Sequence, residues 1–415
     1  MMRKEKKYTF SKALYLVAGM LLGAGVTALA VAGGYYLDQS DTTVSTSVSS
    51  SAAASESDSF VDSDFLYKLL TIESLIKNYY YLDEVDNQTL ADGVFAGLLD
   101  SLGDVYSTYY TVEETESLAE STEGAYYGIG TYVQQDADTG YVKITGVISG
   151  TPAEEAGFLA GDVIYEVDGE NVLGLDSSQV VALIKGDEGT WVTVTVMRGD
   201  ELLDIDVQRR RIETVTVTYE LLDDNIAYVQ LTEFDDVTVD QFEEALEELE
   251  ADGAVGLILD LRDNPGGSLY SVVEIADMLL GEGLILYTED NSGNREEYTS
   301  DAARELELPI VLLVNENSAS AAEVLTGALK DHGKATVVGV TTYGKGIVQT
   351  VRTLSDGSSV KLTTSAYYTP NGTNIHGVGI TPDVEVELDT EAYLEDGSDN
   401  QLETAVETMK DLLGD

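Results

Sequence analysis

Serine and threonine are the side chains that could act as nucleophiles, because the 415-residue chain contains no cysteine. Ser320 is the strongest candidate, since it follows the apolar run PIVLLV and opens a stretch of helical periodicity near Ala319. The first N–H groups of a helix lack intrahelical partners, so they could stabilise an oxyanion beside such a serine. A serine in this position is more often an N-cap, and both interpretations stay open on this feature alone.

A serine nucleophile needs a base, and the chain from residue 212 onward has five lysines, at positions 330, 334, 345, 361 and 410. Lys345 lies between Gly344 and Gly346, which allow close backbone approach and therefore burial. An amine must be neutral to accept a proton, and burial favours the neutral form. A solvent-facing turn lysine is the plainer interpretation. His376, in NGTNIHGVGITPD, is a competing base, and the residues alone leave the two pairs nearly equal.

These side chains lie in a region, residues 212–390, where predicted strands and helices alternate. The strands are IAYVQLTEF, VGLILDLRDNPGG, ILYTED, PIVLLVNEN and KATVVGVTTYG, and the helices between them are VDQFEEALEELEADG, SVVEIADMLLG and SASAAEVLTGALKDHG. Helices between apolar, β-branched strands predict an α/β layered domain. Residues 391–415 carry apolar positions at helical spacing and predict a C-terminal helical extension.

Residues 122–211 have a different pattern, with short alternating runs separated by turns. The segment from Gly128-Ile129-Gly130 through GVISGTPAEEAGFLAGDVIYEVDGENV resembles a PDZ domain, a β-sandwich-like module. The resemblance implies that the Gly128–Gly130 backbone receives the carboxylate of a peptide C-terminus, with the peptide added as a strand. Two glycines in an ordinary hairpin are the plainer interpretation of that loop.

The pattern of the N-terminal residues predicts attachment to a membrane. Residues 13–37 are uncharged and long enough to span a bilayer, and the basic cluster before them places the N-terminus inside. We expect residues 1–37 to be a cytoplasmic tail and retained anchor, with a cleaved signal peptide as the alternative. Residues 38–63 are rich in Ser, Thr, Ala and Asp and predict a disordered linker. Residues 64–121 predict a small helical segment.

Composition excludes several functions. With 22 Lys and Arg against 76 Asp and Glu, the net charge of −54 repels phosphate backbones, so nucleic-acid binding is not expected. The absence of cysteine excludes disulfides and thiolate metal sites. Two histidines leave little material for a histidine-rich metal centre. We therefore expect neither a metal nor a cofactor.

From residue 65 to about 390 the sequence resembles the carboxyl-terminal processing peptidases, also called tail-specific proteases, of the S41 family. The motifs that carry the resemblance occur in the family's order: LLDSLGDVYSTYY, the PDZ-like module, LILDLRDNPGG, NENSASAAE, TYGKGIVQ and YYTPNGTNIHGVGITPDV. The chain departs from the common family pattern at Ala322, often a serine, and at Asp263, often an asparagine. Neither departure touches a group with a required chemical role.

The resemblance implies the roles of individual residues. Ser320 is the nucleophile, Lys345 is the base twenty-five positions later, and Gln349 orients the lysine amine. Oxyanion donors map to Gly266, with Gly267 as the alternative, and to Ala321. His376 becomes a structural residue of the loop. Glu323, in the first turn of the helix, is interpreted as a charge matched to the helix dipole.

We therefore expect a multidomain α+β and α/β chain that acts as a serine endopeptidase on protein tails outside the cytoplasmic membrane. Its partners would be proteins or peptides with exposed C-termini and, through the N-terminal helix, the membrane. The terminal helical segments could make homodimer contacts or only cover the core. Two other hypotheses remain: a membrane-tethered peptide-binding scaffold with an inert α/β domain, and a peptidase that uses His376 as the base.

Overall fold

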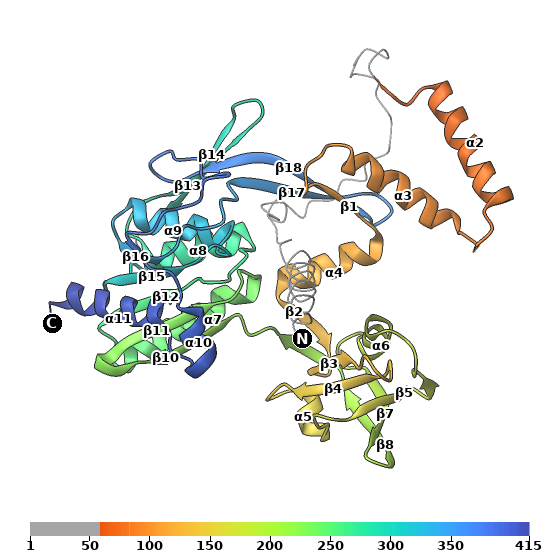
Figure 1. Cartoon of the computed structure of the whole chain (residues 1–415), viewed down its shortest axis with the longest axis horizontal. Helices are drawn as coiled ribbons and strands as arrows, with labels where there is room; N and C mark the ends of the chain where they lie inside the picture. Colours follow the sequence, from red (N-terminus) through yellow and green to blue (C-terminus); the bar gives the residue numbers. More distant parts are fainter. Residues whose placement is uncertain (1–58, 83, 302, 415) are drawn as a thin grey trace, which may run out of the picture. The chain divides into compact units, whose positions relative to one another are not determined.

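A computed structural model describes residues 59–82, 84–301 and 303–414, with the elements labelled in Figure 1. The expected anchor, residues 1–37, lies outside the described residues, as does the expected linker apart from residues 59–63. None of the helices in the described part of the chain is long and apolar enough to cross a bilayer. The chain divides into two compact units, and the described residues of the second are 59–115, without 83, and 349–364.

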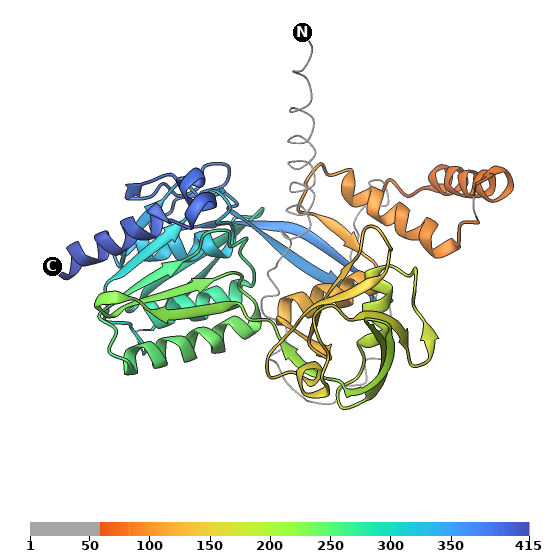
Figure 2. The same ribbon diagram turned by 60° about the horizontal axis from the view of Figure 1, so that its bottom comes forward.

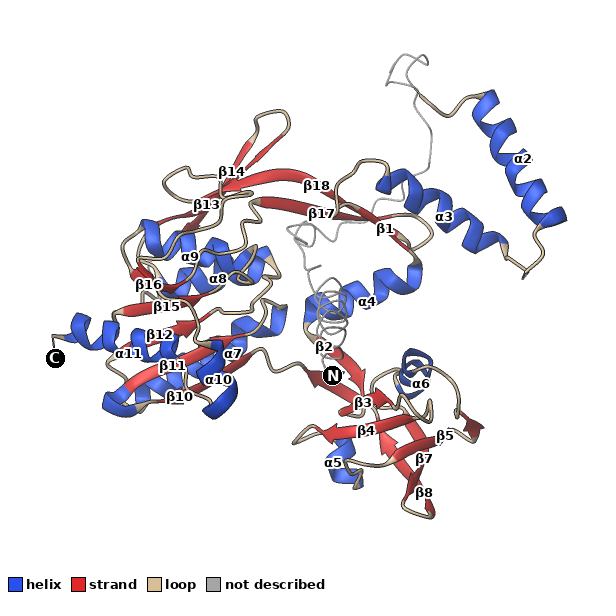
Figure 3. Cartoon of the chain, in the orientation of Figure 1, coloured by secondary structure: helices blue, strands red, loops and turns tan. Residues whose placement is uncertain are grey.

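The first unit contains a six-stranded sheet in the order β10-β11-β12-β15-β16-β19. These strands are Val217–Leu221, Ile226–Leu231, Gly256–Asp260, Ile310–Val314, Ala335–Gly339 and Val384–Glu385. All neighbouring pairs from β11 to β19 are parallel, and β10 is the antiparallel edge. Helices α7 (Asp236–Ala251), α8 (Leu269–Leu279) and α9 (Ala321–Asp331) occur between successive strands, as the alternation in Figure 3 shows and as the sequence predicts.

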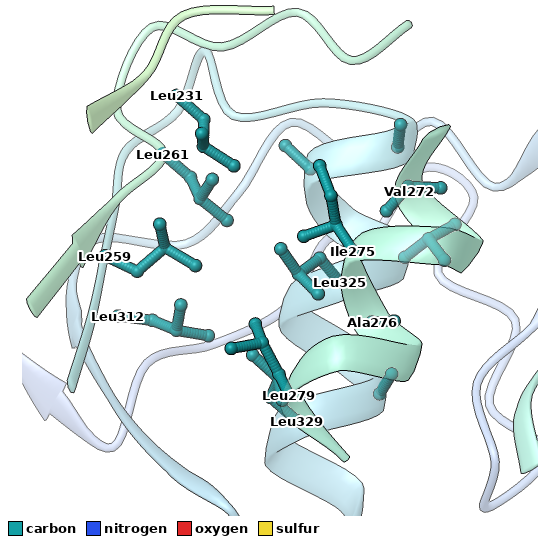
Figure 4. Packing of buried hydrophobic residues seen from close by; sticks show 14 of the residues in the cluster. Leu231, Leu259, Leu261, Val272, Ile275, Ala276, Leu279, Leu312, Leu325 and Leu329 are labelled. Atoms are coloured by element: carbon teal, nitrogen blue, oxygen red, sulfur yellow. The ribbon is translucent and has the colours of Figure 1, made fainter. Parts of the chain in front are cut away.

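The sheet is covered on both faces, and every residue of its central strands β12 and β15 is buried. In β12, Leu257 and Leu259 join the core with α7, α8 and α9, whereas Ile258 faces the opposite core with α11 (Asn400–Leu413). This alternation follows from the two-residue period of a strand. Figure 2 shows α7 and α11 on opposite faces of the sheet, and Figure 4 shows leucines of the sheet facing α8 and α9. The result is a three-layer α/β arrangement.

Residues 124–213 form a separate β-rich module. Its sheet has the order β3-β4-β5-β7-β8, and its strands are Thr131–Gln135, Val142–Val147, Val163–Val167, Trp191–Arg198 and Glu201–Gln208, with the short β6 (Glu170–Asn171) paired to β5. Helices α5 (Pro152–Ala156) and α6 (Ser177–Ile184) complete it. The module has its own core, which includes Ile144, Ile164, Val180 and Val194. Strands β2 (Ala125–Gly128) and β9 (Arg210–Glu213) pair at its base.

The first unit also has an antiparallel arm made of β13 (Gly283–Asp290), β14 (Arg295–Ser300) and the end of β18 (Ser359–Tyr368). β13 pairs with β18 from Tyr287↔Tyr368 to Asp290↔Ser365. β17 (Ile347–Thr353) also pairs with β18, and α10 (Thr390–Asp396) precedes α11. The division between the two units falls within β17 and β18.

The second unit consists of α2 (Ser63–Tyr79), α3 (Asn87–Asp100) and β1 (Thr108–Tyr110), which pairs with β18 from Thr108↔Lys361 to Tyr110↔Ser359. α4 (Val112–Glu123) begins in this unit and ends in the first. The sequence predicts the three helices of residues 64–121 but not β1. The reason is physical, since a three-residue strand exists only through a partner that follows it by about 250 residues.

Candidate active site

Ser320 occupies a strained turn between β15 and α9. Its backbone has φ 53° and ψ −114°, a conformation that side-chain-bearing residues rarely adopt. The backbone is held on both sides: Ser320 N donates to Glu323 Oε2 at 3.0 Å, and Tyr367 Oη donates to Ser320 O at 3.2 Å. Such strain persists only where the surrounding structure fixes it, and it is common at reactive residues.

The loop before Ser320 is pinned to the loop after β12, because the carboxyl ends of two neighbouring parallel strands meet at one edge of the sheet. Asp263 Oδ1 accepts from Asn315 Nδ2 at 2.9 Å and from Asn317 Nδ2 at 2.7 Å. Ser318 Oγ donates to Leu261 O at 2.7 Å. The aspartate that departs from the family pattern thus serves as a bridge between two loops.

Lys345 is 2% exposed and lies in the loop between β16 and β17. Its flanking glycines are required by the packing. A Cβ on Gly344 would lie 2.9 Å from Gly379 N, and one on Gly346 would lie 2.6 Å from His376 N. The glycines therefore allow the segment around His376 to close over the lysine loop, as their spacing predicts.

Glu323 joins the serine and lysine loops. Its Oε2 accepts from Ser320 N at 3.0 Å and from Lys345 N at 2.8 Å, so these two backbone nitrogens are no more than about 6 Å apart. Its Oε1 accepts from Thr342 Oγ1 at 2.6 Å and from Gly344 N at 2.7 Å. Burial raises the pKa of the Glu323 carboxyl, and the donors from Thr342, Lys345, Gly344 and Ser320 oppose that rise.

Sequence reasoning missed this bridge. Glu323 does lie in the first turn of α9, where its charge suits the helix dipole, but it is fully buried and bonded to a loop some twenty residues away. The usable signal was the capping pattern of a serine followed three residues later by glutamate, which directs the carboxylate back toward the helix start.

Gly266 lies against Ser320. A Cβ at this position would be 2.7 Å from Ser320 Cβ and 2.8 Å from Ala321 N, so the predicted serine and both main oxyanion residues are brought together. The Gly266 N–H donates to Asn264 Oδ1 at 2.8 Å. Its use as an oxyanion donor would require that bond to open, and the neighbouring Gly267 N–H is the alternative. Helices α8 and α9 both begin within a few residues of this point, which favours negative charge there.

The other predicted site residues lie as follows. Gln349 is in β17 of the second unit, and its Nε2 donates to Thr363 Oγ1 at 3.3 Å. Its contact with Lys345 stays a prediction. His376 is exposed, and its backbone N donates to Asn374 Oδ1 at 2.9 Å. Among the residues that the structure describes, no three His, Asp or Glu side chains are grouped to hold a metal ion.

The predicted peptide-binding loop lies at the start of the β-rich module. Gly128 ends β2 opposite Arg210, and Ile129 is 2% exposed. Gly130 has φ 89°, and a Cβ there would collide with Thr151, so the position requires glycine. The carbonyls of Ile129 and Gly130 accept from Ala153 N and Ile148 N at 2.8 and 3.0 Å. The three residues thus form a turn held against α5.

Known families match three segments of the chain. The model of peptidase family S41 matches residues 225–386, that of the PDZ domain matches residues 143–198, and that of the activating protease CtpB N-terminal domain matches residues 20–115. These segments fall on the α/β domain, the β-rich module and the N-terminal part, in the order that the motifs predict.

Individual proteins similar to this chain are also described as proteases. The carboxy-terminal processing protease CtpA of Bacillus subtilis (strain 168) is 37% identical over 354 residues, which cover 85% of this chain and 74% of the relative. A probable CtpA-like serine protease of Staphylococcus aureus (strain COL) is 37% identical over 335 residues, covering 80% and 66%. Among solved structures, a photosystem II D1 C-terminal processing protease is similar at 30% identity and a TM-score of 0.45, covering 79% of this chain and 94% of that one.

Proposed function

Because the chain belongs to peptidase family S41 as a C-terminal processing serine protease with a PDZ domain, we propose that Ser320 is its nucleophile and Lys345 its general base. The observation that carries this assignment is the Glu323 carboxylate, whose single oxygen Oε2 binds the backbone N–H groups of both residues. One buried anion thereby holds the two loops at a fixed separation. The proposal needs this, because a dyad works only when base and nucleophile are held within reach.

In the proposed reaction, Ser320 Oγ attacks the peptide carbonyl while Lys345 Nζ takes its proton, and Lys345 later returns the proton to the leaving amine. The resulting ester is then hydrolysed by water. The oxyanion would be stabilised by the N–H of Ala321 and by an N–H of the Gly266–Gly267 loop, which lies against Ser320. Gln349 would orient the lysine amine, and neither a metal nor a cofactor takes part.

The dyad is tested by cleavage of casein or a tail-tagged protein with Ser320→Ala and Lys345→Ala, both expected to lose activity by about a thousandfold or more. Lys330→Ala is the matched control, because this lysine is on α9 but forms a surface ion pair with Asp383 at 2.6 Å. Full activity in either dyad variant would contradict the mechanism. Loss in His376→Ala with activity kept in Lys345→Ala would establish histidine as the base. If the parent protein binds C-terminal tails but never cleaves them, the alternative of a peptide-binding scaffold with an inert α/β domain would hold.

Capture of C-terminal tails is proposed for the Gly128–Gly130 turn. Gly128→Val is the informative variant, because a Cβ at Gly128 would approach the Tyr126 ring at 3.0 Å, whereas Gly130 is enclosed by Thr151. In a Ser320→Ala background, fluorescence anisotropy should show weaker binding of a labelled peptide with a free C-terminus. The same peptide with an amidated C-terminus is the control. Equal affinity of parent and variant would reject the loop assignment.

We place the catalytic domain outside the cytoplasmic membrane, held by residues 1–37. The support is the uncharged run at residues 13–37 behind a basic cluster. Amino-terminal sequencing of the mature protein from a membrane fraction tests this. A mature chain that starts near residue 31 or 33 would show a cleaved signal peptide instead.

A homodimer is proposed through α2. Leu66 and Leu70, which share a face one helical turn apart, are 49% and 61% exposed, and no residue of the helix is buried. An apolar helix face of this size is typical of an interface. Sedimentation of the soluble part of the chain should give a dimer, and Leu70→Glu should give a monomer. A parent that sediments as a monomer at high concentration would exclude this assembly.

A further inference from the structure

The turn between β11 and α7, residues 232–236, is bonded directly to the loop that lies against Ser320. Phe234 N donates to Gly266 O at 2.9 Å, and Ser268 N donates to Phe234 O at 2.6 Å. The Phe234 side chain is fully buried. Any displacement of this turn therefore moves the backbone of the Gly266–Gly267 loop.

Asp235, the next residue of the turn, has an unusual environment for an acid. It is 3% exposed, and its Oδ1 is buried without a hydrogen-bond partner in the described part of the chain. It packs against Gly124, where the β-rich module begins: a Cβ on Gly124 would lie 2.7 Å from Asp235 Cβ and 3.0 Å from its Oδ2. Asp235 is also the N-cap of α7. A buried carboxylate with one oxygen unsatisfied is more expensive when ionised than when neutral.

The surrounding charges increase that cost. Burial first, and then the negative charges of Glu233 and Asp236, raise the pKa of Asp235 to about 7. Burial also raises the pKa of Glu233 and of Asp236, the latter with a contribution from Glu123. The titratable and charged groups on the elements around the turn are Glu123 of α4, Arg211 and Glu213 of β9, Glu233, Asp236 and Asp240 of the turn and α7, and Tyr270 of α8. Arg211 is paired with Glu123 and Glu213.

We propose that Asp235 is a protonatable positioning residue, which holds the 232–236 turn against the Gly266–Gly267 loop when neutral and loosens that contact when ionised. The role rests on the proposed function, since it acts through the loop assigned to the oxyanion. The ionised carboxylate lowers its energy by moving toward water, and the Phe234 backbone, one residue away, moves with it. The proposed result is a protease whose oxyanion loop is less ordered at alkaline pH than at mildly acidic pH.

The sign of the stability effect follows from the raised pKa. The folded state holds the Asp235 proton more tightly than the unfolded chain, where the pKa is near 3.8. The stabilisation is therefore present at low pH and is lost as the pH rises from about 4 through about 7.

Hydrogen exchange tests the proposal without requiring activity. In a Ser320→Ala background, protection of the amides at positions 266–268, corrected for intrinsic exchange, should fall about threefold or more from pH 6 to pH 8.5. Asp235→Asn should remove that fall, and Asp240→Asn, the same change at an exposed position of α7, should keep it. An equal fall in Asp235→Asn would overturn the proposal. If Asp235→Asn does not fold, Glu233→Gln replaces it as the test variant. In Glu233→Gln, the pH at which half of the amide protection is lost must move lower, because one charge that repels the Asp235 carboxylate is gone.

Catalysis supplies the second measurement. The ratio of kcat/KM in Asp235→Asn to that in the parent should rise about threefold with pH, with a midpoint near 7, because contributions from Lys345 cancel in the ratio. If the kcat/KM ratio does not change with pH although the amide exchange does, the turn responds to pH but does not position the active site. That result would also reject the proposal. If the parent cleaves nothing, the proposed function fails, while the exchange result still decides whether the turn responds to pH.

Discussion

Helices α9 and α2 have similar apolar content at helical spacing, but their surroundings are opposite. Every residue of α9 from Ala321 to Leu329 is buried, whereas no residue of the seventeen in α2 is buried. α9 begins directly after Ser320, the proposed nucleophile, and packs in the core of the first unit, while α2 belongs to the second unit. Helical periodicity therefore predicts that a helix forms, but it does not predict which surface buries the apolar side of that helix. The burying surface comes from residues that are distant in sequence or from another chain.

The sharpest test of this contrast is Glu323, the buried carboxylate in the first turn of α9. Glu323→Gln replaces an anion that accepts four hydrogen bonds by an amide that must turn a donor toward N–H groups. We expect kcat to fall by about a hundredfold with little change in KM, because the geometry of the proposed dyad loosens while the substrate contacts stay. Steady-state kinetics on a peptide substrate measure this. Glu316→Gln, an exposed glutamate of the preceding loop, is the matched control, and kcat within about threefold of the parent in Glu323→Gln would remove Glu323 from the site.

Leucine truncation should separate the two helices by stability. Leu325→Ala empties a fully buried position of α9 and should cost about 2–5 kcal/mol, while Leu70→Ala in α2 should cost less than about 0.5 kcal/mol within one chain. Thermal unfolding at low and high protein concentration measures both. If Leu70→Ala lowers the stability strongly only at high protein concentration, a second copy of the chain covers α2. If the two variants lose equal stability at low concentration, α2 and α9 do not differ in burial as described.

Replacing a glycine by alanine should change the free energy of unfolding in opposite directions in the two units. A Cβ on Gly327 of α9 would lie 2.8 Å from Thr369 Cγ2, so Gly327→Ala should destabilise by about 1–3 kcal/mol. Gly97 of α3, in the second unit, has nothing within 4 Å of such a Cβ, so Gly97→Ala should stabilise by about 0.5–1 kcal/mol. Urea unfolding of the two variants beside the parent decides this, and shifts of the same sign would argue against it.

The smallest effect is expected for Tyr367→Phe, which removes the phenol that donates to Ser320 O while keeping the ring. Complete burial holds the pKa of Tyr367 well above its ordinary value, so the phenol stays a donor at any working pH. We expect a stability loss of about 1 kcal/mol and a modest decrease in kcat. Unchanged thermal stability and kcat would mean that the strained turn needs no support from this side.

The sequence predicts the parts of the site that depend on local pattern. The strand-to-helix change before Ser320 and the glycines around Lys345 follow from apolar runs and backbone freedom, and both are present in the structure. The Glu323 bridge could not be derived in this way, because its donors come from residues 342–345 and only folding brings them near. β1 was missed for the same reason, and the expected anchor lies outside the described residues.

The backbone of Ser320 restricts which nucleophiles this fold could use. At φ 53° a threonine would be strongly disfavoured, because a β-branched side chain is a genuine outlier in the left-handed region. A serine, with a single substituent on Cβ, has a smaller penalty there. The choice of the proposed nucleophile is therefore limited by main-chain sterics before any question of acidity or reactivity arises, and a hydroxyl of equal chemistry on a branched carbon would strain this turn.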